Sequence, residues 1–104
     1  MLQLESKEEF DKIVVNIKGD DPIYILFKAP WCPTCARIST IMDSKSFNCY
    51  SVDTSIEPNK PIAQKYRVNF VPTLLILKND GISVSGETVV GPIKILEKIN
   101  SMNV

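Results

Sequence analysis

The residues of this sequence best suited to chemistry are two cysteines separated by only two residues. Cys32 and Cys35 enclose Pro33 and Thr34. Proline is favoured in the first turn of a helix, so we expect a helix to begin at Pro33 with Cys32 at its N-terminus. The free N–H groups and the positive end of the helix dipole stabilise a thiolate at that position. The pattern therefore predicts a nucleophilic thiol at Cys32.

The spacing of the two cysteines also favours a disulfide bond that opens and closes. Residues i and i+3 of a helix have Cβ atoms about 5–6 Å apart, and a disulfide needs roughly 3.5–4.5 Å. The first turn therefore has to tighten only slightly. The closed loop is so short that the bond gains little chain-entropy stabilisation. These properties indicate a redox catalyst with no cofactor other than the Cys32–Cys35 disulfide itself.

Two alternatives explain the same pair without redox chemistry. A tetrahedral zinc site needs four ligands, but the sequence has no histidine and only one further cysteine, Cys49. We therefore expect no metal site. A buried pair without function is the second alternative, because cysteine packs like a small hydrophobic residue. Trp31 before the pair, the proline inside it and the predicted helix start argue against that alternative.

The elements that must position the cysteines follow from the hydrophobic periodicity. Ser6 and Glu9 form a capping box at the start of a helix expected from Lys7 to Lys18. The run Ile23–Phe27 is apolar throughout, which is typical of a central strand buried on both faces. The other expected elements are a strand at 2–4, a helix from 33 to 43–46, a strand at 47–53, a short helix after 61, a strand at 73–77, a turn at 79–81, a strand at 82–85 and a helix from 92.

This order predicts an α/β fold with a mixed central sheet in the sequence βαβαβαββα, flanked by helices. At 104 residues the chain has the size of one domain with one core, residues 1–104. Twelve basic residues balance twelve acidic ones without any basic run, so attraction to nucleic acid or to an anionic membrane has no source. The N-terminus lacks an apolar signal region and the apolar runs are too short to span a bilayer. We expect a cytoplasmic monomer.

Two stretches of the sequence resemble the thioredoxins. They are residues 27–35, FKAPWCPTC, and residues 69–77, NFVPTLLIL, and the likeness extends to Asp53 and to Val90–Gly91. The resemblance covers nearly the whole chain and implies a thioredoxin fold with thiol–disulfide oxidoreductase activity. It also implies that Cys32 is the attacking thiolate and Cys35 the buried resolving thiol. Disulfide-containing proteins would be the substrates, with a thioredoxin-reductase-like enzyme or glutathione as electron donor.

The resemblance further implies a substrate surface around the cysteines. Pro72 should be cis and face them, Val71 should pair its backbone with extended substrate, and Trp31 should belong to the docking surface. The alternatives are simple packing for Trp31 and an ordinary strand start for Pro72. The other residues expected to contact substrate are Pro33, Thr34, Thr73 and Gly91.

The sequence departs from the usual thioredoxin pattern at several positions. Leu26 stands where thioredoxins carry a buried aspartate, which is credited with helping to deprotonate the resolving cysteine. Proline directly after Cys32 is a glutaredoxin feature, and the segment from Cys35 to Asp53 is short, so we expect a stunted helix there. Lys28 replaces a frequent aromatic residue, and our hypothesis is that it tunes the thiolate. The alternative is a solvated lysine.

Three further functions compete with a reductase of protein disulfides. A glutaredoxin-like enzyme would need a glutathione site, but residues 89–92 offer no acidic residue for it. A binding module of the same fold would use the apolar surface without turnover. An iron–sulfur carrier would hold a cluster between two chains through Cys32. Cys49, in a predicted apolar strand, is expected to be an inert core residue, with a regulatory or dimer-forming thiol as its alternative.

Overall fold

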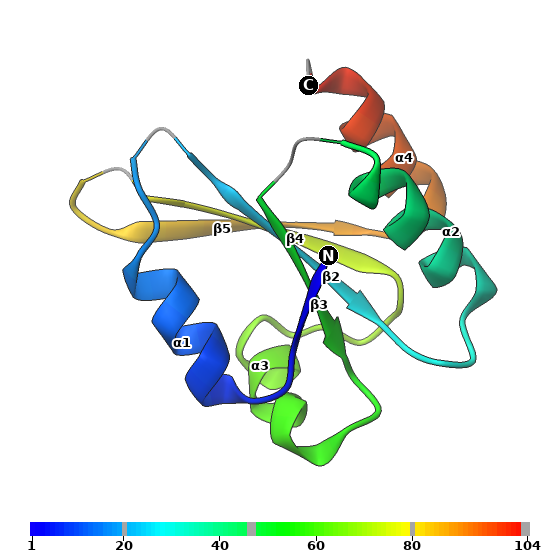
Figure 1. The fold of residues 1–104 in the computed structure, drawn as a ribbon, viewed down its shortest axis with the longest axis horizontal. Coiled ribbons are helices and arrows are strands. Elements are labelled where there is room, and N and C mark those ends of the chain that lie inside the picture. Colours follow the sequence, from blue (N-terminus) through cyan, green and yellow to red (C-terminus); the bar gives the residue numbers. More distant parts are fainter. Residues whose placement is uncertain (20, 46–47, 80, 103–104) are drawn as a thin grey trace.

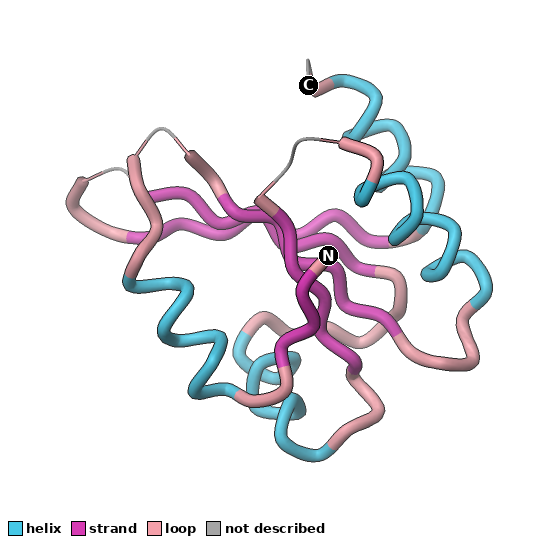
Figure 2. The backbone as a smooth tube through the Cα atoms, in the orientation of Figure 1, coloured by secondary structure: helices cyan, strands magenta, loops and turns pink. Residues whose placement is uncertain are grey.

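The computed structural model describes residues 1–19, 21–45, 48–79 and 81–102, and its elements follow the predicted order (Figures 1 and 2). The strands are β1 (Leu2–Leu4), β2 (Ile23–Lys28), β3 (Cys49–Asp53), β4 (Thr73–Asn79) and β5 (Val84–Val90). The helices are α1 (Lys7–Val15), α2 (Pro33–Asp43), α3 (Lys60–Lys65) and α4 (Pro92–Ser101), with a 3₁₀ turn at Glu57–Asn59 before α3.

The strands form one mixed sheet in the order β1-β3-β2-β4-β5. β3 is parallel to both β1 and β2, whereas β4 runs antiparallel to β2 and β5 antiparallel to β4. Helices α1 and α3 cover one face of the sheet and α2 and α4 cover the other, which gives three layers (Figure 1). The predicted α/β fold, a mixed central sheet flanked by helices, is confirmed.

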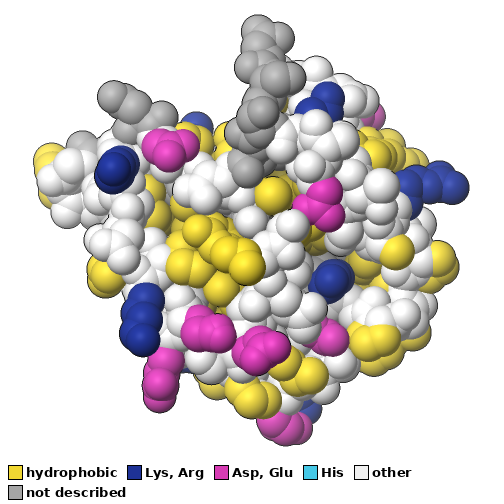
Figure 3. Space-filling view, viewed as in Figure 1, with side chains coloured by type: hydrophobic (Ala, Val, Ile, Leu, Met, Phe, Trp, Pro, Cys, Tyr) yellow, Lys and Arg dark blue, Asp and Glu magenta, His cyan; other side chains and the backbone are white. Residues whose placement is uncertain are grey.

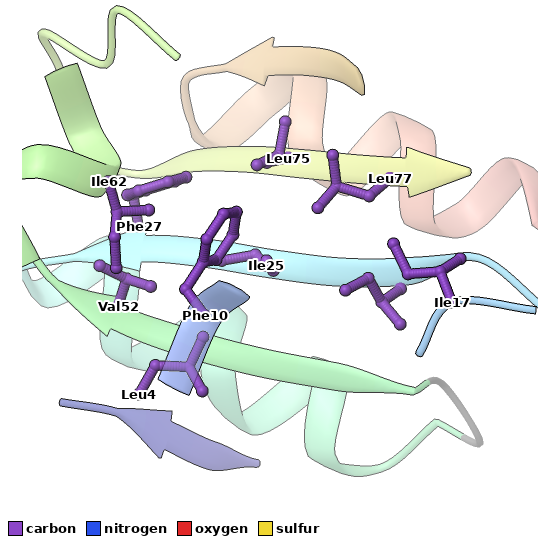
Figure 4. Packing of buried hydrophobic residues seen from close by; sticks show 10 residues of the cluster. Leu4, Phe10, Ile17, Ile25, Phe27, Val52, Ile62, Leu75 and Leu77 are labelled. Atoms are coloured by element: carbon purple, nitrogen blue, oxygen red, sulfur yellow. The ribbon is translucent and has the colours of Figure 1, made fainter. Parts of the chain in front are cut away.

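The central strand β2 contributes to a hydrophobic cluster on each face, as its apolar sequence predicts. Ile25 and Phe27 pack with Phe10 of α1 and Ile62 of α3, and all four side chains are fully buried (Figure 4). Leu26 points the other way, into a second cluster that contains Ile38 and Met42 of α2 and Ile95 and Ile99 of α4. Alternating side chains of one strand thus anchor both helix layers.

Helix α1 ends three residues earlier than the predicted boundary at Lys18. One half of its capping box forms as expected, with the Glu9 N–H donating to Ser6 Oγ, whereas the Glu9 carboxylate accepts from the Glu5 N–H rather than from that of Ser6. The helix ends at Val15, and Asn16 caps it by donating from its side chain to the Lys12 carbonyl. The predicted helix extended too far because Ile17 continues the helical spacing of apolar residues in α1. Ile17 is buried, but it reaches the core from the loop that follows the helix.

Strand β5 lies further along the chain than the predicted 82–85. It pairs with the full length of β4, from Thr73 opposite Val90 to Asn79 opposite Val84. Most of its side chains are exposed, so the strand carries no apolar alternation by which the sequence could have revealed it. A Cβ at Gly86 would lie 3.2–3.3 Å from the side chains of Leu77 and Leu75, so glycine leaves room there for these two leucine side chains.

Strand β3 begins at Cys49 rather than at Phe47, which lies outside the described residues together with Asp80 of the predicted turn. Basic and acidic side chains are scattered among apolar ones on the face drawn in Figure 3. No helix within the described ranges is long and apolar enough to cross a membrane.

Cys49 is only half-buried, so its expected place inside the core is wrong. It lies at the margin of the cluster between the sheet and α2, beside a cavity of about 240 Å³ that Asp43 and Tyr50 also line. Cys49 is the first residue of β3, and alternation along the strand does not give full burial at that end. Partial burial raises the pKa of the Cys49 thiol above its ordinary value; the Met1 ammonium opposes this shift, and the Asp43 carboxylate adds to it.

We predict that Cys49 alkylates slowly near neutral pH. In the oxidised protein it is the one thiol outside the Cys32–Cys35 disulfide. Because a raised pKa delays formation of the thiolate, iodoacetamide labelling should be slower than that of free cysteine at about pH 7.5. The rate should be half-maximal at a higher pH than for free cysteine, whose midpoint lies near pH 8.5. Mass spectrometry of labelled protein, with Cys49→Ser as control, measures this; a profile equal to that of free cysteine contradicts it.

Candidate active site

The predicted helix start at the cysteine pair is present. Cys32 is the N-cap residue of α2, with an extended backbone (φ −108°, ψ 97°), and Pro33 occupies the first turn. The Cys35 N–H donates to the Cys32 sulfur at 3.2 Å. The sulfur thus accepts a hydrogen bond from one of the backbone N–H groups that have no partner within the helix. Thr34 places its Oγ1 3.5 Å from the same sulfur. Two donors of this kind favour negative charge on Cys32.

Cys32 and Cys35 form a disulfide bond, with their Cα atoms 5.3 Å apart. The two sulfurs differ in access, because Cys32 is half-buried whereas Cys35 is only 1% exposed. Pro33 and Thr34 between them are exposed. An external disulfide can therefore approach Cys32, while Cys35 is placed to react with Cys32 alone.

The loop before β4 carries the second group of predicted site residues. The Val71–Pro72 peptide bond is cis, as the resemblance implied. The Gly91 N–H donates to the Pro72 carbonyl at 3.0 Å, and Thr73 Oγ1 donates to the Phe70 carbonyl at 2.7 Å. Gly91 has φ 94°, a conformation that glycine adopts without strain, and it caps α4. The Gly91 bond fastens the loop to the junction between β5 and α4, and the Thr73 bond closes the loop on itself.

The two loops meet along an apolar groove. Trp31 and Val71 line a cavity of about 370 Å³ together with Val68, Phe70 and others. Trp31 is 70% exposed, so the alternative that it simply packs in the interior is wrong. Phe70 is 69% exposed, and sequence reasoning missed it. The available signal was a large apolar residue directly before Val71–Pro72 in a loop.

A second cavity, of about 280 Å³, lies against the disulfide. Cys32 and Cys35 line it together with Lys28 and Asp53, which end the neighbouring strands β2 and β3 and are paired in register. Both charged residues are half-buried. Lys28 is therefore placed beside the cysteine pair rather than in open solvent, and Asp53 is a charged neighbour to which sequence reasoning gave no role.

Two other expectations concern what lies near the pair. Leu26 is fully buried and packs against α2, so the layer beneath the helix is apolar at this point. Within the described part of the chain, no group of three or more histidine, cysteine, aspartate or glutamate side chains is arranged to hold a metal ion.

Comparison with known proteins agrees with this geometry. The thioredoxin family model matches residues 1–101. Thioredoxin of Haemophilus influenzae is 32% identical over 75 residues, which are 68% of this chain and 68% of that protein. M-type chloroplast thioredoxin of Pisum sativum is 31% identical over 84 residues, or 75% of this chain, but the match spans only 46% of its own length.

Solved structures share the same fold. Trichomonas vaginalis thioredoxin superposes with a TM-score of 0.78 at 22% identity, covering 97% of this chain and 92% of that one. Fasciola hepatica thioredoxin gives a TM-score of 0.73 at 27% identity, covering 96% and 97%. With its CxxC disulfide at the start of α2 and the cis proline before β4, the chain belongs to the thioredoxin family of thiol–disulfide oxidoreductases.

Proposed function

We propose that this protein reduces disulfide bonds in other proteins through Cys32 and Cys35. The observation that carries the proposal is the unequal access of the two sulfurs at the start of α2. In the reduced protein the Cys32 thiolate attacks one sulfur of a target disulfide, and the other target sulfur leaves as a thiolate. The Cys35 thiolate then attacks Cys32, which releases the second target sulfur and restores the Cys32–Cys35 disulfide.

Two electrons must afterwards return to the pair from a donor. We propose a reductase enzyme as that donor. A solved complex of ferredoxin:thioredoxin reductase and thioredoxin f2 contains a chain that this one resembles, with a TM-score of 0.77 and 23% identity. The residues 89–92 supply no acidic side chain for the amino group of glutathione, which favours a reductase over glutathione. We also propose that the protein is a monomer and that it acts in the cytoplasm.

Substitution of each cysteine should separate this function from a binding module. With dithiothreitol as donor, the wild-type protein should accelerate insulin reduction, and Cys32→Ser should abolish the acceleration because the nucleophile is gone. When reduced Cys35→Ser is mixed with insulin without dithiothreitol, it should accumulate a mixed disulfide on Cys32, visible by mass spectrometry. Cys49→Ser is the matched control and should keep the wild-type rate. A wild-type protein that gives no acceleration would favour the binding module instead.

The groove between Trp31 and Phe70 is the proposed contact for the substrate chain. It is lined by Trp31, the residue before Cys32, and by Val71, so a target segment that places its cysteine at Cys32 would reach it. Val71 would pair with that segment through its backbone, as an added strand does. Pro33 and Thr34 would border the segment, with Pro72, Thr73 and Gly91 holding the loop in place. Two exposed aromatic side chains make the groove suited to an apolar neighbour of the target cysteine.

Phe70→Ala should therefore change substrate preference. We expect kcat/KM to fall by about 10-fold for a disulfide peptide with leucine beside its cysteine, the size of effect that losing part of an apolar pocket has. A peptide with serine at that place should be little affected. Ile82→Ala is the matched control, because Ile82 is 95% exposed and no groove around the pair includes it. Equal losses for both peptides would remove Phe70 from recognition.

We propose that Lys28 supplies positive charge to the Cys32 thiolate, since both line the cavity beside the disulfide. Lys28→Ala should then shift the pH profile of Cys32 alkylation in the reduced protein to higher pH. The shift should be less than about one pH unit, because a single charge acting through water contributes only about 1 kcal/mol at 4 Å. Lys12→Ala, which removes an exposed lysine of α1, is the control. Superimposable curves would remove Lys28 from the mechanism.

A further inference from the structure

The resolving step requires that a buried thiol lose its proton. Cys35 is 1% exposed, its thiolate is the attacking species, and burial disfavours that charged form. Directly beneath α2 the sheet offers Leu26, which packs with Ile38 and Met42 and cannot accept a proton. A base for Cys35 must therefore come from another direction.

The cavity of about 280 Å³ supplies that direction. Cys35 lines it, and so do the polar residues Gln3, Lys28 and Asp53. Since a water molecule takes up roughly 30 Å³ of liquid volume, several fit there. A proton can move along hydrogen-bonded water from the Cys35 sulfur to a group on the cavity wall.

Strand register explains why these polar side chains meet the cysteine pair. Leu26 faces α2, and side chains two residues apart on a strand share a face, so Lys28 faces α2 as well. Ser51 pairs with Leu26 and Asp53 with Lys28, which places Asp53 on that same face. It lies at the end of β3, where α2 begins and the sheet's apolar interior stops.

We propose that Asp53 accepts the proton of Cys35 through water in this cavity during the resolving step. The proposal rests on the reductase function proposed above. The Cys35 S–H gives its proton to the Asp53 carboxylate, and the resulting thiolate attacks Cys32 in the mixed disulfide. The bond between Cys32 and the target sulfur breaks, the Cys32–Cys35 bond forms, and the target leaves as a thiolate. Asp53 returns its proton to that thiolate or to solvent.

The Asp53 carboxylate is held in a way that suits this role. Its Oδ1 accepts hydrogen bonds from the Ser55 N–H at 2.8 Å and from Ser55 Oγ at 2.6 Å. These bonds fix the side chain through one oxygen and leave Oδ2 for water. The charged lining residues of the cavity are Asp53 from β3 and Lys28 from β2, while Gln3 from β1 and the α2 residues carry no formal charge. The ammonium of Lys28 can stabilise the thiolate that forms.

Asp53→Asn tests the proposal, because asparagine keeps an oxygen for the Ser55 bonds but is no base. Reduced protein is mixed with the aromatic disulfide 5,5′-dithiobis(2-nitrobenzoate), and the release of the second coloured thiolate is followed by stopped flow from about pH 6 to 9.5. This release reports the resolving step without a protein substrate. The variant should be slower by at least about 10-fold at pH 7. This minimum is below the roughly 10²–10⁴-fold that general-base catalysis typically contributes.

The pH profile distinguishes a base from a merely structural residue. The variant rate should rise about tenfold per pH unit, because hydroxide replaces the missing base, and it should meet the wild-type rate at the alkaline end. Glu57→Gln is the control, since Glu57 is an exposed carboxylate in the 3₁₀ turn that follows β3, and it should follow the wild type. A variant profile that coincides with the wild type, or that lies below it equally at every pH, overturns the proposal.

A second variant guards against a folding defect in the first. Asp53→Ala should be slow at pH 7 and should be accelerated in proportion to added acetate, which can enter the vacated cavity and act as the base. Acceleration by acetate that is no larger than in Glu57→Gln counts against the role. If the wild-type Cys32 forms no mixed disulfide with the reagent at all, the proposed reductase function fails, and this inference fails with it.

Discussion

The site depends on the burial of β2 on both of its faces. Ile25 and Phe27 are held by one helix layer and Leu26 by the other, so the strand has a single position between them. Where β2 ends, at Lys28, the chain must leave the sheet, and Pro33 starts α2 only five residues later. This packing fixes Cys32 at the N-terminus of α2, because Leu26 of β2 also packs against the inner face of that helix. Without that packing the cysteine pair would have no defined direction towards a substrate.

The features that the sequence predicted best are those encoded by neighbouring residues. The apolar run of β2, the Ser6 cap of α1 and the Pro33 helix start are local signals, and each is present in the structure. The prediction is wrong where contacts between distant segments determine the boundaries of an element. Ile17 repeats the helical spacing but is buried from a loop, and β5 is held by backbone pairing to β4 while its side chains face solvent.

The site shows the same division. Cys32 and Cys35 are close in sequence and could be identified directly, whereas Trp31 and Pro72 entered through resemblance to the thioredoxins. Phe70 and Asp53 were given no functional role because their place beside the pair depends on contacts between distant segments. Phe70 shares a groove with Trp31 across about forty residues, and Asp53 reaches the cavity only through the pairing of β3 with β2.

The replacement of a buried aspartate by Leu26 has a physical advantage as well as a chemical cost. A carboxylate beneath α2 would have to give up its hydration inside an apolar cluster, a penalty of several kcal/mol for an ion without a partner. Leu26 instead adds apolar contact to the packing of α2. Asp53 and Lys28 lie beyond Ser51 and Leu26 on the same face of the sheet, at the ends of β3 and β2. There water in the cavity keeps both charges solvated and connects them with Cys35. A proton acceptor at the end of β3 thus serves the buried thiol without placing a charge in the core that holds α2.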